Sequence, residues 1–565
     1  MAKVISIGNQ SFESIRKEDC FYIDKTYFIK EWWENKDNVT LITRPRRFGK
    51  TLNMSMFECF FSNKYKDRGD LFEGLEIWND EKYRKLQGTY PVIFLSFAEI
   101  KQNNYNDAVE KIKRIICEVC QQFDFLKNWD GLTEIEKKNI SNISYNMSDV
   151  MAQDLIKNMS NYLSRYYGKK VIILLDEYDT PMQEAYVNGY WEELVAFTRS
   201  LFNSTFKTNP YLERAIMTGI TRVSKESIFS DLNNLKVITV TSDEYSKCFG
   251  FTEDEVFAAL DEQGLSSEKE KVKLWYDGFT FGDEKDVYNP WSIINFLDEK
   301  KYKTYWADSS SNGLVNELIR TGSAEIKKTM ETLMAGGTVE KNIDEQIVFE
   351  QLKTNKDAVW SLLLASGYLR VETFRTEGRL NKKIYSLKLT NYEVEQMFGA
   401  MIERWFGGAD VPYNEFINAM LDGDIESMNE YMNRVTRGVI SYFDTGKTPS
   451  DEEPERFYHG LVLGLMVDQV DNYILNSNRE SGYGRYDIML EPIDKTNEKY
   501  PGIVIEFKVI NPRKESSLEE TVAVALKQIE EKNYDAELIK RGVKEENIHH
   551  YGFAFKGKEV LIDGR

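Results

Sequence analysis

The stretch Val39-Thr-Leu-Ile-Thr-Arg-Pro-Arg-Arg-Phe-Gly-Lys-Thr51 decides the fold of the first part of the chain. Its first five residues are apolar or β-branched and predict a strand, and the following residues, 52–61, have the spacing of a helix. The polar loop between them ends in Gly49-Lys50-Thr51. Backbone N–H groups at a helix start cradle phosphates, a lysine reaches the outer phosphates, and a hydroxyl binds Mg²⁺. The stretch therefore predicts a phosphate-binding loop.

The loop departs from the pattern G-x-x-x-x-G-K-[ST] at its first position, where Arg44 replaces glycine. A Gly-Lys-Thr sequence alone is a weak signal, and a lysine-capped turn is the structural alternative. Inside the loop, Arg46 and Arg47 could neutralise phosphate charge, with Phe48 and Gly49 completing the nucleotide-binding set. Solvated basic residues beside a loop are the alternative for both arginines.

Two further apolar strands end in residues suited to the same site. Val171-Ile-Ile-Leu-Leu-Asp-Glu177 ends in paired acids. We expect Asp176 to hold Mg²⁺, and Glu177 to orient and deprotonate the water that attacks the γ-phosphate. Ala215-Ile-Met-Thr-Gly219 places Thr218 where it could sense the γ-phosphate, on a strand between the other two. The three segments together predict an ATP site.

Residues 1 to about 250 alternate such strands, including Pro91–Phe97, with longer stretches of helical spacing. Continuous apolar strands separated by helices are typical of a parallel sheet that is covered on both faces. We therefore expect an α/β domain over residues 1–250.

These segments resemble the AAA-ATPase-like family of bacterial proteins, which carries an Arg-Pro-Arg-Arg-Phe-Gly-Lys loop in place of the glycine-initiated one. The segments Phe12-Glu-Ser-Ile-Arg16 and Tyr22-Ile-Asp-Lys-Thr26 add to the resemblance. It covers about residues 5 to 290, and it implies a P-loop NTPase sheet with ATP and Mg²⁺ as cofactors. Arg199 and Arg222 are candidates for an arginine that acts on the γ-phosphate, with ordinary ion pairing as the alternative.

Residues 251–445 are expected to be mainly helical. Phe251-Thr-Glu-Asp-Glu-Val256 predicts a helix behind a threonine cap, and Tyr288-Asn-Pro290 predicts the start of another. The latter segment and Trp275–Phe281 resemble the helical lid that follows such ATPases. A winged-helix module near residues 300–400 is an alternative for part of this region.

The last segment, residues 446–565, begins with a polar linker and then changes in pattern. Its expected elements are a helix over 455–475, strands over 485–491 and 502–509, a helix over 518–532, and strands over 549–555 and 559–562.

Three charged residues lie on the first two of these strands. Alternation puts Glu506 and Lys508 on one face, with Phe507 opposite, and pairing of the two strands would bring Asp487 to Glu506. Two carboxylates that hold Mg²⁺ and a lysine that stabilises charge on phosphate are what metal-assisted phosphodiester hydrolysis needs. The pattern is short, and a solvated strand edge is the alternative.

The arrangement resembles the PD-(D/E)xK nuclease superfamily, which has a restriction-endonuclease-like α/β fold. The resemblance makes Asp487 the first acid and assigns Glu506 and Lys508 to the E-x-K motif. It matches Gln528 and Tyr534 to the Gln-x₅-Tyr helix signature of RecB-like members.

Two residues on the helix that leads this segment are weaker candidates. Glu455 is a candidate additional acid, with a helix N-terminal charge as the alternative. His459 could face the same site, and a partly buried helix histidine is its alternative.

Composition limits the partners. The chain has 73 basic and 92 acidic residues and a net charge of −19, which disfavours indiscriminate binding to polyanions. Residues 451–565 contain 16 basic and 23 acidic residues, so any contact with nucleic acid must be local. Five scattered cysteines do not form a disulfide framework, and the pair Cys117 and Cys120 fits helix packing better than zinc. With no signal or membrane-length apolar segment, a cytoplasmic protein is expected.

We therefore predict an AAA-like ATPase fused to a Mg²⁺-dependent nuclease-like domain that acts on DNA rather than RNA. One alternative is a nucleotide-switched signalling or scaffold protein whose last domain binds without cutting. Another is an ATPase that remodels protein complexes. In each case the protein could form a homo-oligomer or bind a protein partner.

Overall fold

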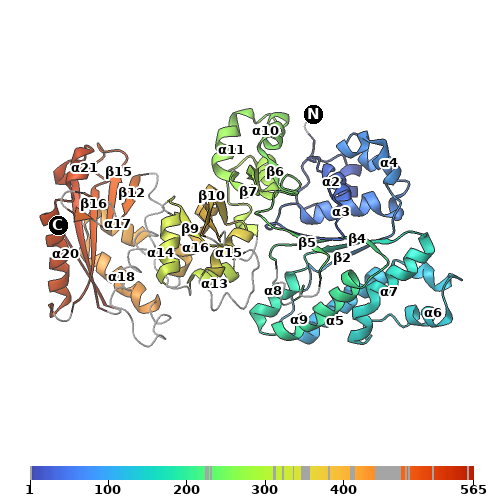
Figure 1. Cartoon of the computed structure of the whole chain (residues 1–565). Coiled ribbons are helices and arrows are strands. Elements are labelled where there is room, and N and C mark those ends of the chain that lie inside the picture. The colour runs from blue at the N-terminus through green and yellow to red at the C-terminus, as the bar shows by residue number, and fades with distance from the viewer. Residues whose placement is uncertain are drawn as a thin grey trace. The chain divides into compact units, whose positions relative to one another are not determined.

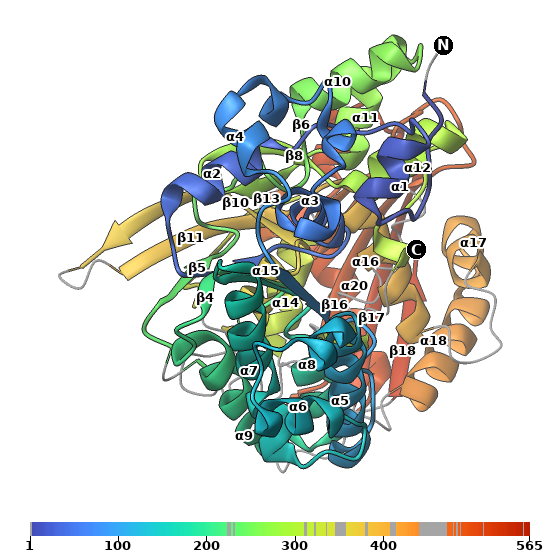
Figure 2. The same cartoon turned by 90° about the vertical axis from the view of Figure 1, so that its right-hand side faces the viewer.

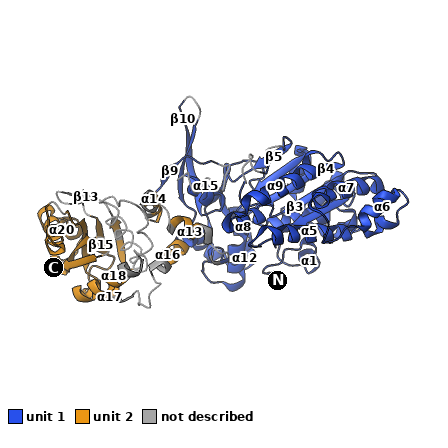
Figure 3. Ribbon diagram, turned by 90° about the horizontal axis from the view of Figure 1, so that it is seen from below, with its two compact units in different colours: residues 1–314, 338–395 blue, residues 315–337, 396–565 orange. Residues whose placement is uncertain are grey.

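The computed structural model describes the following residues: 3–222, 228–229, 232–309, 313–320, 324–334, 336–344, 357–378, 382–406, 414–439, 472–477, 480–481, 484–485, 487–511, 514–556 and 559–565. Two compact units are distinguished by colour in Figure 3. The first comprises residues 1–314 and 338–395, and the second comprises residues 315–337 and 396–565. The division into three domains at residues 250 and 445 stays a prediction.

The first unit is built on a parallel five-stranded sheet in the order β2-β3-β4-β1-β5. Its strands are β1 (Val39–Thr43), β2 (Val92–Ser96), β3 (Val171–Asp176), β4 (Leu212–Gly219) and β5 (Leu235–Ile238). Every residue of β1 and β3 is buried, as strands covered on both faces require. The predicted parallel α/β sheet is therefore confirmed.

Helices cover both faces of this sheet (Figures 1 and 2). On one face lie α2 (Tyr27–Asn35) and α3 (Lys50–Phe61). On the other lie α5 (Tyr105–Gln121), α7 (Asp149–Tyr167) and α9 (Trp191–Phe202). The remaining helices of this part are α1 (Phe12–Lys17), α4 (Glu81–Leu86), α6 (Glu134–Ser141) and α8 (Thr180–Asn188).

The chain beyond the sheet forms helices with a small three-stranded sheet in the order β6-β8-β7. The elements are β6 (Phe251–Thr252), α10 (Glu253–Glu262), α11 (Lys269–Tyr276), β7 (Phe279–Phe281), β8 (Glu284–Tyr288) and α12 (Pro290–Glu299). Thr252 caps α10 in a reciprocal capping box with Glu255. The Asn289 side chain accepts from the amides of Trp291 and Ser292 at the start of α12. Both predicted helix starts are confirmed.

A helix and a hairpin follow in the same unit. They are α15 (Ala358–Ala365), β10 (Leu369–Glu377) and β11 (Lys382–Leu389), with β9 (Val339–Lys341) paired to β11. The winged-helix interpretation of this segment stays a prediction. Helix α16 (Tyr392–Phe406) begins here, and its residues from 396 onward belong to the second unit.

The second unit contains a mixed sheet in the order β12-β15-β16-β17-β18, in which only the β16–β17 pair is parallel. Its strands are β12 (Tyr473–Ser477), β15 (Ile488–Pro492), β16 (Gly502–Val509), β17 (Ile548–Lys556) and β18 (Glu559–Gly564), beside the short pair β13 (Glu480–Ser481) and β14 (Gly484–Arg485). The helices among its described residues include α13 (Gly313–Arg320), which starts just before the unit, and α14 (Ala324–Met334), α17 (Asn414–Asp422), α18 (Ile425–Val439), α20 (Leu518–Lys532) and α21 (Ala536–Lys540).

The two faces of this sheet have separate apolar cores. On one face, Phe507 packs in a cluster with Met420 of α17 and Met428 of α18. On the other, Val504 packs with Leu526 of α20. The strand β16 is therefore covered on both faces, and its alternating residues point into different cores.

One sequence-based helix ends in the wrong place. The helix expected over 455–475 would include Tyr473, but this residue begins β12, which pairs antiparallel with β15. Residues 455–471 lie outside the described residues. A short apolar run fits a strand as well as a buried helix, so periodicity could not locate this boundary.

The cysteines and the helices bear on two further expectations. All five cysteines are free and buried, and Cys117 and Cys120 both lie in α5. Within the described ranges, no helix combines the length and apolar character that a membrane span requires.

Candidate nucleotide and nuclease-like sites

The loop Arg44–Gly49 joins β1 directly to the N-terminus of α3. Arg47 (φ 65°) and Gly49 (φ 78°) both adopt the left-handed backbone conformation, which turns the chain sharply. Gly49 is the N-cap of α3, and no side chain caps this helix. The amides of its first turn are therefore suited to binding an anion.

Lys50 is the first residue of α3, and its side chain is buried. Its Nζ donates to the carbonyl oxygens of Arg44 at 3.1 Å and Pro45 at 2.9 Å. The same atom lies 3.6 Å from Oε1 of Glu177. The ammonium group is thus held inside the loop, between neutral acceptors and one carboxylate.

Asp176, at the end of β3, connects the polar residues of two other elements. Thr51 Oγ1 donates to its Oδ2 at 2.7 Å, and Thr218 Oγ1 donates to its Oδ1. These residues meet because β4 lies between β1 and β3, and the carboxyl ends of parallel strands share one edge of a sheet. Burial raises the pKa of Asp176, and the charge of Glu177 raises it further, against the two hydroxyl hydrogen bonds and Lys50.

Glu177 follows β3 with a left-handed backbone, φ 54°. A residue with a side chain costs about 1–3 kcal/mol in such a conformation, so the surrounding contacts must enforce it. Its Oε1 faces Lys50, and its Oε2 accepts from Thr180 Oγ1 at 3.4 Å. The strained turn directs this carboxylate toward the phosphate loop.

Arg44 stands where a glycine-initiated loop has its first glycine, and its side chain is fully buried. The guanidinium lies over the Phe281 ring at 4.6 Å and donates to the carbonyl oxygens of Thr43 at 2.9 Å and Thr239 at 2.7 Å. Burial lowers the pKa of Arg44 to about 10. Arg44 is therefore part of the packing beneath the loop, which explains why the loop does not need glycine there.

The remaining loop residues differ in exposure. Arg46 and Arg47 are exposed, and the Arg47 guanidinium lies 4.3 Å from the centre of the Trp291 ring. Phe48 is buried against Phe279, with ring centres 4.8 Å apart. Contacts of these residues with a nucleotide stay predictions, as do those of Gly49, Lys50 and Thr51.

Asp179, which no motif in the sequence singles out, is fully buried. Its Oδ2 accepts from Thr221 N and Thr221 Oγ1, both at 2.8 Å, from Ile220 N at 3.1 Å and from Gln183 Nε2 at 2.9 Å. Burial raises the pKa of Asp179. This carboxylate fixes the loop after β4, next to Thr218, and its only sequence signal was a further acid two residues after Glu177.

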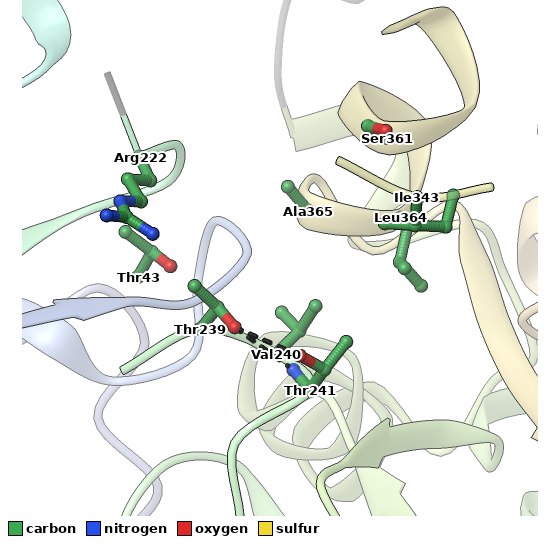
Figure 4. A pocket seen from close by; sticks show the side chains of 9 residues that line it. All are labelled: Thr43, Arg222, Thr239, Val240, Thr241, Ile343, Ser361, Leu364 and Ala365. Atoms are coloured by element: carbon green, nitrogen blue, oxygen red, sulfur yellow. Dashed lines mark hydrogen bonds between the residues drawn. The ribbon is translucent and has the colours of Figure 1, made fainter. Parts of the chain in front are cut away.

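A small pocket lies at the carboxyl ends of β1 and β5, and Arg222 stands beside Thr43 at its edge (Figure 4). The other lining residues are Thr239, Val240, Thr241, Ile343, Ser361, Leu364 and Ala365. Arg199, in contrast, lies on α9. An action of either arginine on a γ-phosphate stays a prediction.

Asp487, Glu506 and Lys508 gather at one end of β15 and β16. The last pair of the two strands is Ile488 with Ile505, and Asp487 and Glu506 each lie one residue beyond it. Asp487 Oδ2 accepts from Phe507 N at 2.9 Å. Glu506 is buried, and Lys508 Nζ donates to its Oε1 at 2.6 Å. The pairing that the sequence analysis required is present.

Helix α20 contributes to the same cluster. Gln528 Nε2 donates to Oε1 of Glu506 and, at 3.1 Å, to the hydroxyl of Tyr534. Burial raises the pKa of Tyr534. Glu506 thus faces α20, while Phe507 points into the opposite core, as strand alternation requires.

Both candidate metal sites contain few protein ligands. In the part of the chain that the structure describes, no group of three or more His, Cys, Asp or Glu side chains could hold a metal ion. Thr51 with Asp176, and Asp487 with Glu506, offer only oxygen donors. Such sets fit Mg²⁺, which usually retains several waters and binds substrate phosphates. Glu455 and His459 lie outside the described residues.

Two family models match the chain, one in each of the two units. Residues 6–229 match the family model described as "Predicted AAA-ATPase", and residues 453–564 match that of the PD-(D/E)XK nuclease superfamily. A protein of Azotobacter chroococcum mcd 1, described as "Uncharacterized protein in vnfD 5'region", is 25% identical over 396 residues, which make up 70% of this chain and 68% of that protein. The chain therefore combines an AAA-ATPase-like domain with a C-terminal domain of the PD-(D/E)XK nuclease superfamily, which confirms both resemblances.

Proposed function

We propose that the first unit binds and hydrolyses ATP with Mg²⁺. The proposal is supported above all by two contacts near the ends of β1 and β3: Thr51 donates to Asp176, and Lys50 lies close to Glu177. Lys50 binds the outer phosphates, and Thr51 with Asp176 holds Mg²⁺, which neutralises phosphate charge when bound. Glu177 takes the proton of the attacking water, and Thr218 orients Asp176 and senses the γ-phosphate.

Replacing Lys50 tests this half of the proposal. Lys50→Ala should weaken ATP binding by about 10–100-fold, because charge-assisted bonds to phosphate are lost. The measurement is titration with a fluorescent ATP analogue, with melting curves to show that the variant folds. Lys64→Ala is the control, since Lys64 is an exposed lysine near the end of the same helix. A folded Lys50→Ala protein that binds ATP as wild type does would contradict the proposal.

We propose that the C-terminal domain hydrolyses phosphodiester bonds, with DNA as substrate. The convergence of Asp487, Glu506 and Lys508 with Gln528 supports this chemistry. Asp487 and Glu506 would hold a divalent ion, which acidifies a water and neutralises the scissile phosphate when bound. Lys508 stabilises charge on the phosphate, and Gln528 keeps the Glu506 carboxylate in place.

Cleavage assays and metal titration test this second half separately. Asp487→Ala should abolish cleavage of linear, circular or single-stranded DNA in the presence of Mg²⁺ or Mn²⁺. Glu506→Gln should abolish Mn²⁺ binding measured by calorimetry. Glu531→Gln, an exposed change on α20, should leave both properties intact. Cleavage by Asp487→Ala at the wild-type rate would exclude this site as the source of activity.

A second candidate function is a nucleotide-switched scaffold whose last domain binds without cutting. It is favoured by the charge of residues 451–565, where 23 acidic residues outnumber 16 basic ones, because a DNA-cutting domain usually presents a basic surface. Mn²⁺ binding that depends on Glu506, with no cleavage of any DNA or RNA substrate, would favour this function.

A further inference from the structure

The main-chain carbonyl of Arg46 receives two hydrogen bonds from the segment beyond the large sheet. Asn289 Nδ2 donates to it at 3.3 Å, and Trp306 Nε1 donates to it at 3.0 Å. Arg46 lies in the middle of the phosphate loop, so these bonds bear on the part of the loop that must fit around phosphates. Asn289 and Trp306 lie just before and shortly after α12.

One buried carboxylate, that of Glu393, binds both Trp306 and the start of α12. Glu393, at the start of α16, is fully buried. Its Oε1 accepts from the backbone amide of Trp306 at 2.6 Å, and its Oε2 accepts from Ser292 Oγ at 2.8 Å. Ser292 N in turn donates to Oδ1 of Asn289 at 3.4 Å. Glu393 therefore ties Trp306 and the capped start of α12 into one network.

Aromatic packing adds to the hydrogen bonds. Trp306 packs against Phe279 at 5.4 Å between ring centres, and Phe279 packs against Phe48 of the phosphate loop at 4.8 Å. The Arg47 guanidinium lies over Trp291, the second residue of α12. Three consecutive loop residues thus contact the same segment, 279–306.

From these contacts we infer that Asn289 and Trp306 are positioning residues for the phosphate loop, held by Glu393. The inference rests on the proposed ATP site. The loop conformation that binds phosphates is then stabilised by this network, and ATP binding stabilises the network in return, because such coupling is reciprocal. Glu393 belongs to helix α16, whose later residues belong to the second unit. ATP binding therefore changes the stability of the contacts made at the start of that helix.

Asn289→Asp removes the donor of one of the two bonds to the Arg46 carbonyl. Aspartate keeps the acceptor that caps α12 and is an equally good N-cap, but it cannot donate to the Arg46 carbonyl. We expect ATP affinity to fall about three- to tenfold, the effect of one lost hydrogen bond. Trp306→Phe removes the indole N–H and keeps a ring, and we expect a fall of similar size. Asn295→Asp is the matched control, because Asn295 Nδ2 donates to Trp291 O within the same helix, at 2.7 Å.

Hydrogen exchange supplies a readout that a merely structural role would not change. In wild type, ATP should slow exchange of the Trp306 and Ala307 amides, both of which donate to Glu393, and in Asn289→Asp this protection should be reduced. A wild-type protein that binds no ATP would refute the proposed function itself. Wild-type binding with equal affinity and equal protection in Asn289→Asp and Trp306→Phe would overturn the inference alone. An equal loss in Asn295→Asp would also overturn it, since charge on α12 would then explain the effect.

Discussion

Three acids at the end of β3 have different surroundings. Asp176 accepts from two hydroxyls, and Asp179 accepts from the amides of Ile220 and Thr221. Burial raises the pKa of Asp176 and of Asp179. Glu177 keeps about a fifth of its side chain exposed, at 21%. This exposure supports the proposal that Glu177 takes the proton of the attacking water.

Glu177→Gln should therefore separate ATP turnover from ATP binding. Glutamine keeps the size and polarity of the side chain but cannot accept the proton, so turnover should fall about 10²–10⁴-fold. Phosphate release measures the turnover, and analogue titration should give unchanged affinity. Glu192→Gln, an exposed change in the first turn of α9, is the control. Turnover within a factor of two of wild type would assign the base to another residue.

Asp277 gives a prediction about pH. Burial raises the pKa of Asp277 to about 7, and the neighbouring charge of Asp286 contributes in the same direction. The unfolded chain has a pKa of about 3.9 for this group, so between about pH 4 and 7 the folded state binds more protons. Stability from this group therefore falls as pH rises through that window and is constant above it.

Asp277→Asn should remove this dependence. We compare the melting temperatures of the variant and wild type at pH 5 and pH 8. The melting temperature of the variant relative to that of wild type should be higher at pH 8 than at pH 5, because at pH 8 wild type must bury an ionised carboxylate. Asp283→Asn, an exposed change in the turn between β7 and β8, should melt at the same temperature as wild type at both pH values. A difference between Asp277→Asn and wild type that does not vary with pH would contradict a raised pKa.

At the scale of elements, the sequence predicts the strands that are buried on both faces. It does not predict the elements that only contacts with distant residues define. The strands β1 and β3 consist of apolar or β-branched residues up to Asp176 because both of their faces are covered. The strand β12 was mistaken for the end of a helix, since only its pairing with β15 identifies it. Nothing local predicts that Arg44 would be buried beneath Phe281.

The contact between helix α18 and strand β18 is likewise not predictable from local sequence. Side-chain amides of α18 bind the outer edge of β18. Asn429 Nδ2 donates to Ile562 O at 2.7 Å, and Ile562 N donates to Asn429 Oδ1 at 2.8 Å. Asn433 makes the same pair of bonds with Val560. These asparagines stand in for a further strand and satisfy backbone groups that an edge would expose.

Asn429→Ala should destabilise the C-terminal domain by about 1–3 kcal/mol, because two backbone groups of Ile562 lose their partners. Urea unfolding followed by a probe in that domain measures the change. Glu430→Ala, an exposed change on the same helix, should shift the midpoint far less. Equal midpoints for the two variants would mean that the amide contacts add no stability.

At the scale of the whole molecule, each candidate site lies within one unit, and this explains why sequence motifs located both. Lys50 and Asp176 belong to the first unit, and Asp487 and Glu506 belong to the second. Each set lies at the ends of strands that short patterns identify. A coupling network such as that of Glu393 has no compact pattern, because its members come from separate helices and loops and meet only after folding.

Control of cleavage by the nucleotide would make an asymmetric prediction for the full chain. Lys50→Ala, which removes a phosphate contact, should change the rate of DNA cleavage in the presence of ATP. Asp487→Ala should abolish cleavage and leave ATP turnover at the wild-type rate, because the carboxylate that it removes lies in the other unit. Both activities should be measured on the same preparations, with and without ATP. If Lys50→Ala cleaves as wild type does under both conditions, the two domains act independently, and the ATP site serves a purpose other than control of the nuclease-like site.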